Sequence, residues 1–505
     1  MLIFLKVLTM LFNSYIFIFF FLPLSFFVYF YLNKLRLTKV SKIFLVCASL
    51  FFYSWWNLDY LPLIIGSIFF NYLISKLLIN NNYRSKIPKK IYLVFGIFAN
   101  IMLLGYFKYA DFFIENCNFF FTTNFQALNL LLPLAISFFT FQQIGYLVDS
   151  YNREINENDF LNYSLFVSFF PQLIAGPIVH HKEMMPQFAN IRNKIINYKN
   201  ISIGLFIFVI GLFKKVVIAD TFSFWVSAGF DSAINLNFFE AWLTSLSYSC
   251  QLYFDFSGYV DMAIGAALLF NIKLPINFNS PYKSTNIQDF WRRWHITLSR
   301  FLKEYIYLPL GGNKRSELRA CLNLMATFII GGFWHGAGWL FIFWGFLHGF
   351  ALIVLKFWKQ LNLEIWSWVS IFITFNFVNF TWIFFRATKW SDALKVVKGM
   401  LSFKDIELLL NNQLSFSVFN NLDPQIAGFK FEIIKLYKFI LRPDINIFII
   451  FSIAFALFIT FVFPNSYQLS RNFKPNILYS FTVVFLLFMC VIFIDKNSEF
   501  LYFNF

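Results

Sequence analysis

Three of the five histidines lie within residues 286–348, and their setting is the strongest sign of chemistry in the sequence. His335 lies inside an apolar run from about 321 to 357. Small residues let helices approach closely and let the backbone break where it lines a cavity. An ionisable side chain in such a run faces the protein interior, so we predict that His335 is functional. The alternative is a neutral imidazole that hydrogen-bonds between helices. The residues that surround it are Gly331, Gly332, Gly336 and Gly338.

His295 lies in a different setting, at the end of the sequence NIQDFWRRWH. Thr285 and Gln288 have the spacing of a capping box, so we predict that a helix begins near Asn286 and ends before Pro309. His295 is then either a functional residue or an interfacial side chain beside two tryptophans. One face of the predicted helix carries Trp291, His295, Leu298 and Leu302.

The positions of the three remaining histidines indicate structural roles. His348 follows His335 by 13 residues, which places it on roughly the opposite side of an ideal helix. His180 and His181 follow a proline and look like loop residues, for which we expect no direct role.

The acidic residues and cysteines exclude several other chemistries. Asp255 and Asp261 are too far apart for one helix face, so we expect them in a polar network. The sequence contains no serine-hydrolase elbow, no Walker A motif and no H-E-x-x-H zinc helix. Five scattered cysteines without a C-x-x-C pair argue against a disulfide framework and a thiolate metal site. We therefore predict no metal ion.

The composition defines the class of protein that must position these residues. The 505 residues are 59% hydrophobic, 23% aromatic and only 13% charged, and many apolar runs reach the length that spans a bilayer. The net charge of +16 does not indicate nucleic acid, because Lys and Arg gather in short loops between spans. We therefore predict an all-α, multi-pass membrane protein.

The order of apolar and basic segments gives an expected topology. Two basic loops separated by an uncharged turn predict an extracytoplasmic amino terminus. Pro171, Gly176 and Pro177 break the run 160–179 and predict a re-entrant segment. We expect one domain over 1–505, with an extramembrane loop at 386–444. Besides the run 321–357, the expected spans are 11–31, 43–56, 60–79, 91–107, 131–148, 201–219 (ending at Lys214 and Lys215), 241–270, 366–385, 445–464 and 476–494.

Basic residues gather in the central motif region, 250–350. Between Lys273 and Arg319 there are nine Lys or Arg and three acidic residues. A basic amphipathic helix predicts a position at the cytoplasmic membrane interface. The charge could attract anionic membrane lipids or hold a phosphate-bearing ligand, and the two interpretations are compatible.

Three motifs in this region together resemble the membrane-bound O-acyltransferase (MBOAT) family. They are QLYFDFSGY at 251–259, FWRRWHITLS at 290–299 and GFWHG at 332–336. The resemblance is nearest to the bacterial branch that acetylates alginate or peptidoglycan, and the segments 22–24, 51–56 and 169–177 fit the same branch. It covers most of the chain and is weakest after about residue 390.

This resemblance implies a fold, a reaction and roles for particular residues. The fold would be a ring of about 11 transmembrane helices, with re-entrant and interfacial helices, around a central tunnel. His335 matches the essential embedded histidine, and His295 matches a second histidine that is asparagine in some branches. The acyl donor would be cytoplasmic acetyl-CoA, with no permanently bound cofactor. The acetyl group would pass across the bacterial inner membrane to an extracytoplasmic partner transferase, which modifies a polysaccharide.

The chemistry of acyl transfer is consistent with these assignments. Transfer from a thioester to a hydroxyl needs a base with a pKa near neutrality, which imidazole provides. Arg292 and Arg293 are candidates to hold the CoA phosphates. For the oxyanion, the candidate donors are Trp291, Trp294 and backbone amides. Asp255 belongs to the first motif and is a further substrate-binding candidate.

Other functions remain open at this point. Within the family, D-alanyl transfer to teichoic acid from a carrier protein and lipid acylation are the nearest alternatives. From another class, a transporter or flippase could use intramembrane His and Asp to carry protons. Transporters usually contain paired repeats with broken helices, and the sequence shows no internal repeat.

Overall fold

The computed structural model describes residues 10–79, 87–155, 159–174, 176–314, 316–403, 417–420, 445–494 and 501. Within these residues every regular element is helical and no strand occurs. Seven helical segments are long and apolar enough to cross a membrane. The prediction of an all-α, multi-pass membrane protein is confirmed. The seven segments are Phe17–Lys34, Leu58–Ile79, Lys89–Phe121, Tyr198–Ser232, Phe238–Leu269, Trp339–Gln360 and Ser367–Arg386.

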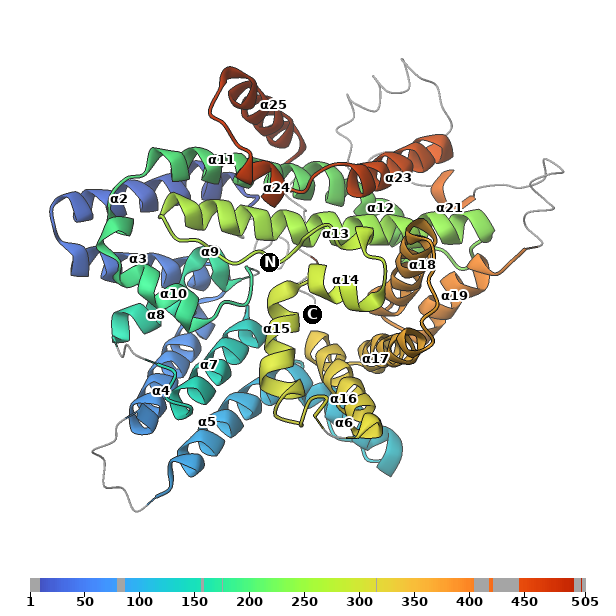
Figure 1. Ribbon diagram of the computed structural model, residues 1–505, viewed down its shortest axis with the longest axis horizontal. Coiled ribbons are helices and arrows are strands. Elements are labelled where there is room, and N and C mark those ends of the chain that lie inside the picture. The colour runs from blue at the N-terminus through green and yellow to red at the C-terminus, as the bar shows by residue number, and fades with distance from the viewer. Residues whose placement is uncertain are drawn as a thin grey trace. The chain divides into compact units, whose positions relative to one another are not determined.

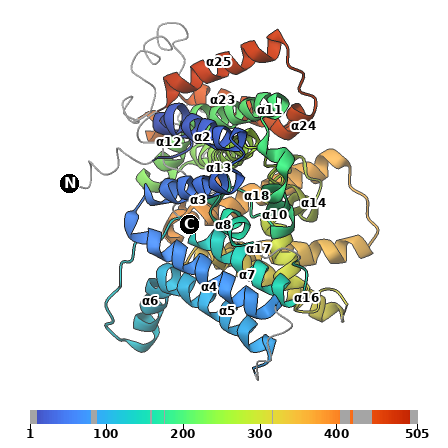
Figure 2. The ribbon, with the colours of Figure 1, turned by 90° about the vertical axis from the view of Figure 1, so that its left-hand side faces the viewer.

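The chain forms two compact units, which are interleaved along the sequence. The first unit comprises residues 1–208 and 259–276. Its helices α4, α5 and α7 lie side by side, as Figures 1 and 2 show. The helices of this unit are α2 Leu22–Lys34, α3 Thr38–Ser54, α4 Leu61–Ile79, α5 Lys89–Leu104, α6 Ala110–Phe121, α7 Ile136–Tyr151, α8 Phe160–Ser168, α9 Phe170–Leu173, α10 His181–Ala189 and most of α11 Tyr198–Phe213.

The second unit comprises residues 209–258 and 277–505 and contains the second and third central motifs and the first one up to Gly258. It contains most of α13 (Phe238–Leu269), which is the most buried of the seven candidate spans. The remaining helices of this unit are α12 Asp220–Ser227, α14 Ile287–Arg293, α15 Ile296–Leu302, α16 Glu317–His335, α17 Trp339–Gln360, α18 Ser367–Arg386, α19 Trp390–Met400, α21 Ser417–Asn420, α23 Ile445–Val462, α24 Ser466–Arg471 and α25 Ile477–Phe493.

The single helix that we predicted from Asn286 towards Pro309 is wrong, because the helix breaks at His295. Helix α14 ends at Arg293 and α15 begins at Ile296, and Figure 1 shows the two running in different directions. The cap is Asn286, whose side chain accepts the N–H of Asp289.

The preceding chain segment stabilises this break. Asn279 donates its N–H to the carbonyl of Arg293 at 2.9 Å, and Ile296 donates its N–H to the carbonyl of Asn277 at 3.0 Å. These bonds satisfy backbone groups that the break removes from the helix. His295 itself has a left-handed backbone with φ of 44°. The residues predicted to share one helix face therefore belong to two short helices.

The long apolar run around His335 breaks as expected. Helix α16 ends at His335, and α17 begins at Trp339, so the break lies at residues 336–338. A Cβ on Gly336 would lie 2.1 Å from the ring of Phe341, so a side chain there has no room. The break therefore places an imidazole at the end of a buried helix.

Two predicted helix ends are wrong. The span expected to end at 107 continues through a π-helical turn, Gly105–Tyr109, to Phe121, so Asp111 lies in α6 and not in a loop. The span expected to end at Lys215 also continues, through the π-helical segment Lys214–Ala219 into α12. Of the predicted loop 386–444, residues 387–403 include α19 and 417–420 form α21, while 404–416 and 421–444 lie outside the described residues.

The run 160–179 is interrupted where the sequence predicted a break. Helix α8 ends at Ser168, and the short α9 has Pro171 at its second position, where the missing N–H costs no hydrogen bond. A Cβ on Gly176 would lie 2.5 Å from the backbone of Gln172. This tight turn leads the chain into α10.

Candidate active site

His335 lies in an aromatic enclosure within the second unit. Its residue is 3% exposed. The ring centroids of Trp334, Trp344 and Phe385 lie 5.0, 5.3 and 5.1 Å from that of the imidazole. The ring centroid of His295 lies 6.4 Å from that of His335. The structure thus brings together two histidines that are 40 positions apart in the sequence.

His295 is fully buried and held by a specific hydrogen-bond partner. Its Nδ1 lies 3.2 Å from Oδ1 of Asn277. The same oxygen accepts the backbone N–H of Thr297 at 3.1 Å and the Thr297 hydroxyl at 3.0 Å. Because a backbone N–H can only donate, the amide atom facing it is the oxygen. Nδ1 of His295 therefore carries the proton, and Nε2 carries the basic lone pair.

Burial also fixes the charge of His295, which lies outside the seven candidate spans. Desolvation lowers the pKa of its imidazole to about 3, because a buried cation loses its hydration. The residue is neutral at physiological pH. A neutral imidazole with a defined tautomer can accept a proton or a hydrogen bond at Nε2.

His348 is fixed by two hydrogen bonds. Nδ1 accepts the indole N–H of Trp291 at 3.2 Å, and Nε2 lies 3.1 Å from the hydroxyl oxygen of Thr381. Thr381 donates its own proton to the carbonyl of Val378, so the imidazole donates to Thr381. This geometry supports the predicted structural role of His348. The N–H of Trp291, one of the predicted oxyanion donors, is therefore already used in a hydrogen bond to His348.

The arginines and Trp294 of the second motif differ in how exposed they are and in the contacts that they already make. Arg292 is exposed, whereas Arg293 donates from Nε to both carboxylate oxygens of Asp289, each at 3.0 Å. Trp294 is buried between Phe278 and Trp382, each with its ring centroid 5.0 Å away. Arg292 is thus the more accessible of the two guanidinium groups.

Asp255 lies in a buried ion cluster. Lys215 Nζ is 2.6 Å from Asp255 and 2.7 Å from Asp220, and Lys215 is 1% exposed. The backbone N–H of Leu501 donates to the second Asp255 oxygen at 3.2 Å. This arrangement supports the polar-network interpretation of Asp255. The sequence did not predict Lys215 as a member of this cluster, because hydropathy places lysines at the ends of spans.

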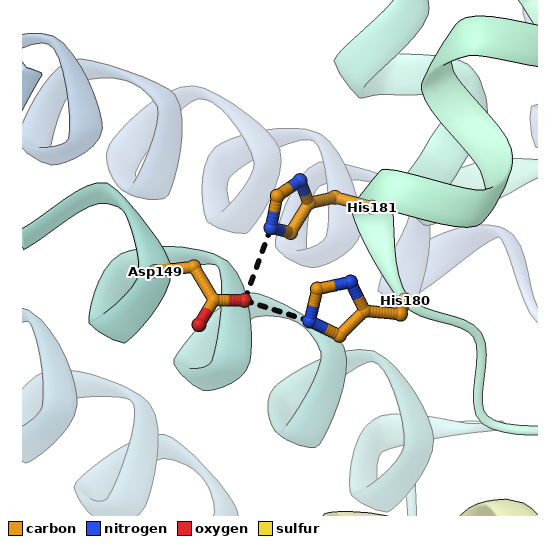
Figure 3. Close-up of side chains that lie close together, drawn as sticks. All are labelled: Asp149, His180 and His181. Carbon is orange, nitrogen blue, oxygen red and sulfur yellow. Dashed lines mark hydrogen bonds and ion pairs between the residues drawn. The ribbon is translucent and has the colours of Figure 1, made fainter. Parts of the chain in front are cut away.

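A second cluster of imidazoles lies in the first unit, where Asp149 of α7 faces His180 and His181 at the start of α10 (Figure 3). One carboxylate oxygen lies 2.8 Å from Nε2 of His180 and 3.0 Å from Nε2 of His181. The three ligand atoms lie within 4.8 Å of one another, close enough to hold a metal ion. The prediction that His181 is a loop residue is wrong, since it begins a helix.

Two observations favour a hydrogen-bonded clamp over a metal ion at these residues. Nδ1 of His180 accepts the backbone N–H of Lys182, so its Nε2 carries a proton that it donates to Asp149. The start of a helix also favours an anion over a cation. Burial is the largest influence on His181 and lowers its pKa, against the hydrogen bond to Asp149, which raises it. The cluster therefore joins α7 to α10 through a buried carboxylate.

These features define an all-α, multi-pass membrane protein with two buried histidines side by side. The model of the MBOAT, membrane-bound O-acyltransferase family, matches residues 148–388. The chain is 47% identical to the peptidoglycan O-acetyltransferase of Helicobacter pylori, over 99% of this chain and 98% of that protein. It is 37% identical to the probable alginate O-acetylase AlgI of Pseudomonas putida, over 79% of this chain and 82% of that protein.

A more distant relative has a different acyl group in its name. The teichoic acid D-alanyltransferase of Streptococcus thermophilus is 27% identical over 51% of this chain and 69% of that protein. The chain belongs to the membrane-bound O-acyltransferase family. It is an O-acyltransferase, and the expectation drawn from its three motifs is confirmed.

Proposed function

We propose that the protein takes an acetyl group from cytoplasmic acetyl-CoA and passes it across the bacterial inner membrane for O-acetylation of a cell-wall polysaccharide. The full-length similarity to a peptidoglycan O-acetyltransferase favours peptidoglycan as the acceptor. The similarity to alginate O-acetylases supports the same reaction on an exported polysaccharide. An extracytoplasmic partner transferase would complete the transfer to the sugar.

The observation that carries the chemistry is the pair of neighbouring imidazoles. In this proposal His335 takes the proton of the attacking hydroxyl, whose oxygen bonds to the thioester carbonyl carbon. The carbon–sulfur bond then breaks, and the proton passes to the leaving thiolate, which departs as CoA thiol. His295 is neutral and fixed by Asn277, so it can orient the hydroxyl through Nε2 without adding charge.

The basic motif region supplies a place for the donor and for lipid headgroups. Arg292 is exposed and has no acidic partner at four residues' distance, unlike Arg293 with Asp289. A guanidinium binds phosphate oxygens well. We assign Arg292 the first contact with the CoA phosphates, and the surrounding lysines and arginines the contact with anionic membrane lipids.

The test uses purified protein and acetyl-CoA labelled in the acetyl group. We expect acetyl release or transfer by the wild type, and a loss of about 10²–10⁴-fold in His335→Ala, the contribution of a positioned base. His180→Asn is the matched control, because it removes an imidazole that belongs to the first unit and keeps a good helix cap. Equal activity of folded His335→Ala and wild type would contradict the assignment.

D-alanyl transfer is a second candidate, supported by the distant teichoic acid relative. Turnover of a D-alanyl carrier protein, without turnover of acetyl-CoA, would favour it. Absence of any acyl turnover, together with transport of a substrate into vesicles, would favour the transporter class.

The proposed acceptor is tested in cells. Deletion of the gene should remove O-acetyl groups from peptidoglycan, measured as acetylated muropeptides by mass spectrometry.

A further inference from the structure

Trp344, on α17, has a buried indole N–H for which the described residues provide no acceptor. The residue is 1% exposed, and its ring is perpendicular to that of His335 at a centroid distance of 5.3 Å. A buried N–H without an acceptor is unfavourable, so each such group in a native structure requires an explanation, of which a catalytic role is one. The presence of a polar N–H at this buried position therefore requires an explanation.

Packing does not explain it, because phenylalanine would fill aromatic space without a polar atom. The neighbouring Trp291 shows the usual solution, since its N–H donates to His348 at 3.2 Å. The rings of Trp291 and Trp344 lie 5.8 Å apart in the same cluster. The N–H of Trp291 thus has its acceptor in the protein, whereas among the described residues the N–H groups of Trp344 and Trp382 have none. Of these two, Trp344 is the one whose ring contacts His335.

The indole is held firmly in place beside the imidazole. It stacks on Trp382 at 5.7 Å with 17° between the planes, and Phe385 contacts both it and His335. The next residue, Gly345, packs so closely on α16 that a Cβ there would lie 2.3 Å from the carbonyl oxygen of Phe328. This close approach fixes α17 against the helix that carries His335. A donor fixed before the reaction costs no reorganisation during it.

We infer that Trp344 is a catalytic residue whose indole N–H donates to the acyl carbonyl oxygen while transfer takes place at His335. This inference rests on the proposed function. When the hydroxyl oxygen bonds to the carbonyl carbon, the carbonyl electron pair moves onto its oxygen and the hydroxyl proton goes to His335. The indole N–H stabilises that oxyanion. As the carbonyl forms again, the carbon–sulfur bond breaks and the thiolate takes the proton.

The structure favours Trp344 over Trp291 for this role, because the N–H of Trp291 is already donated to an imidazole. The donor and the base would then come from opposite sides of one glycine-rich break, with His335 ending α16 and Trp344 on α17. An acyl carbonyl between them would be contacted by both elements.

The first variant is Trp344→Phe, measured with labelled acetyl-CoA in the full-length protein. We expect kcat to fall about 10²–10³-fold, the loss typical of removing one oxyanion donor, with KM for acetyl-CoA changed less than about threefold. The matched control is Trp242→Phe on α13, since its N–H is also buried without an acceptor among the described residues. That variant should keep the wild-type kcat.

A second substitution removes only the N–H. Incorporation of β-(3-benzothienyl)alanine at position 344 replaces the indole nitrogen by sulfur and keeps the bicyclic shape. Its kcat should fall as in Trp344→Phe, with an unchanged melting temperature, which a packing role would not produce. A wild-type kcat for this variant would overturn the inference even if Trp344→Phe unfolds.

The outcomes separate this inference from the proposed function. If wild-type protein turns over acetyl-CoA, His335→Ala is inactive and the benzothienyl variant is fully active, only the role of Trp344 fails. If wild-type protein does not turn over acetyl-CoA or another acyl thioester, the proposed function fails first.

Discussion

A single side chain, Asn277, determines what His295 can do. Its amide oxygen accepts from Thr297 and so makes Nδ1 of His295 the protonated nitrogen. Burial then keeps the imidazole neutral, with a pKa of about 3 in place of the ordinary 6.5. The position, tautomer and charge of this histidine are therefore set by the protein and not by the solvent.

This lowered pKa predicts a pH-dependent stability. Below pH 6.5 the unfolded chain protonates His295, whereas the folded protein does so only near pH 3, so stability falls as the pH falls through this window. At pH 5 the expected loss is about 2 kcal/mol relative to neutral pH. The measurement is thermal unfolding in detergent from pH 7.5 to 5.

The matched variant for this measurement is His295→Asn, which keeps a residue that tolerates the left-handed backbone. It should lose less stability than wild type over the same pH range. His181 also has a lowered pKa but is present in both proteins, so the difference isolates His295. Parallel pH profiles of the two proteins would argue against a neutral buried imidazole.

At the scale of elements, the site depends on how closely α16 and α17 approach. A Cβ on Gly332 would lie 2.2 Å from the carbonyl oxygen of Phe341, and one on Gly345 would lie 2.3 Å from that of Phe328. Both obstacles are backbone atoms, which cannot rotate away. The two helices therefore use glycine on both faces of the contact, as is usual for helices packed in a membrane.

We predict that Gly345→Ala separates these helices. Overpacking of this kind costs about 1–3 kcal/mol, and the shift should lower acyl transfer because Trp344 moves relative to His335. Gly66→Ala on α4 is the control, since a Cβ there meets no atom within 4 Å. The measurements are melting temperature and kcat. Wild-type values for both in Gly345→Ala would contradict the packing argument.

At the scale of the whole molecule, a buried ion cluster joins distant parts of the second unit. Lys215 contacts Asp220 and Asp255, and Asp255 also accepts the backbone N–H of Leu501. Removal of one partner from a buried pair leaves an uncompensated charge, which is more costly than losing the pair as a whole. The three side chains of the cluster therefore stabilise the core only when all of them are present.

Lys215→Met should therefore destabilise the protein by about 3–5 kcal/mol. The neighbouring Lys214→Met is the control, since Lys214 is partly exposed and hydrogen-bonds to Ser466. We expect its effect to be below about 1 kcal/mol, as for other exposed polar groups. Unfolding in detergent measures both. Adding Asp255→Asn to Lys215→Met should recover part of the loss, and a further loss instead would contradict the ion-pair interpretation.

The sequence predicted those features that depend on local composition. The apolar run around His335, interrupted by glycines, predicted the break after α16, and the prolines near 171–177 predicted the break after α8. It did not predict the break at His295, because the bonds from Asn277 and Asn279 that stabilise this break are tertiary. For the same reason the sequence does not predict a buried Lys215, since its two carboxylate partners are visible only in three dimensions.

The left-handed backbone at position 295 also affects which amino acids fit there without strain. A φ of 44° is adopted most readily by glycine, asparagine, aspartate and histidine. Of those four residues, only histidine and asparagine have a side chain that offers both a donor and an acceptor while uncharged near neutral pH. The backbone geometry alone therefore favours a small set of side chains at position 295, independently of what the reaction requires.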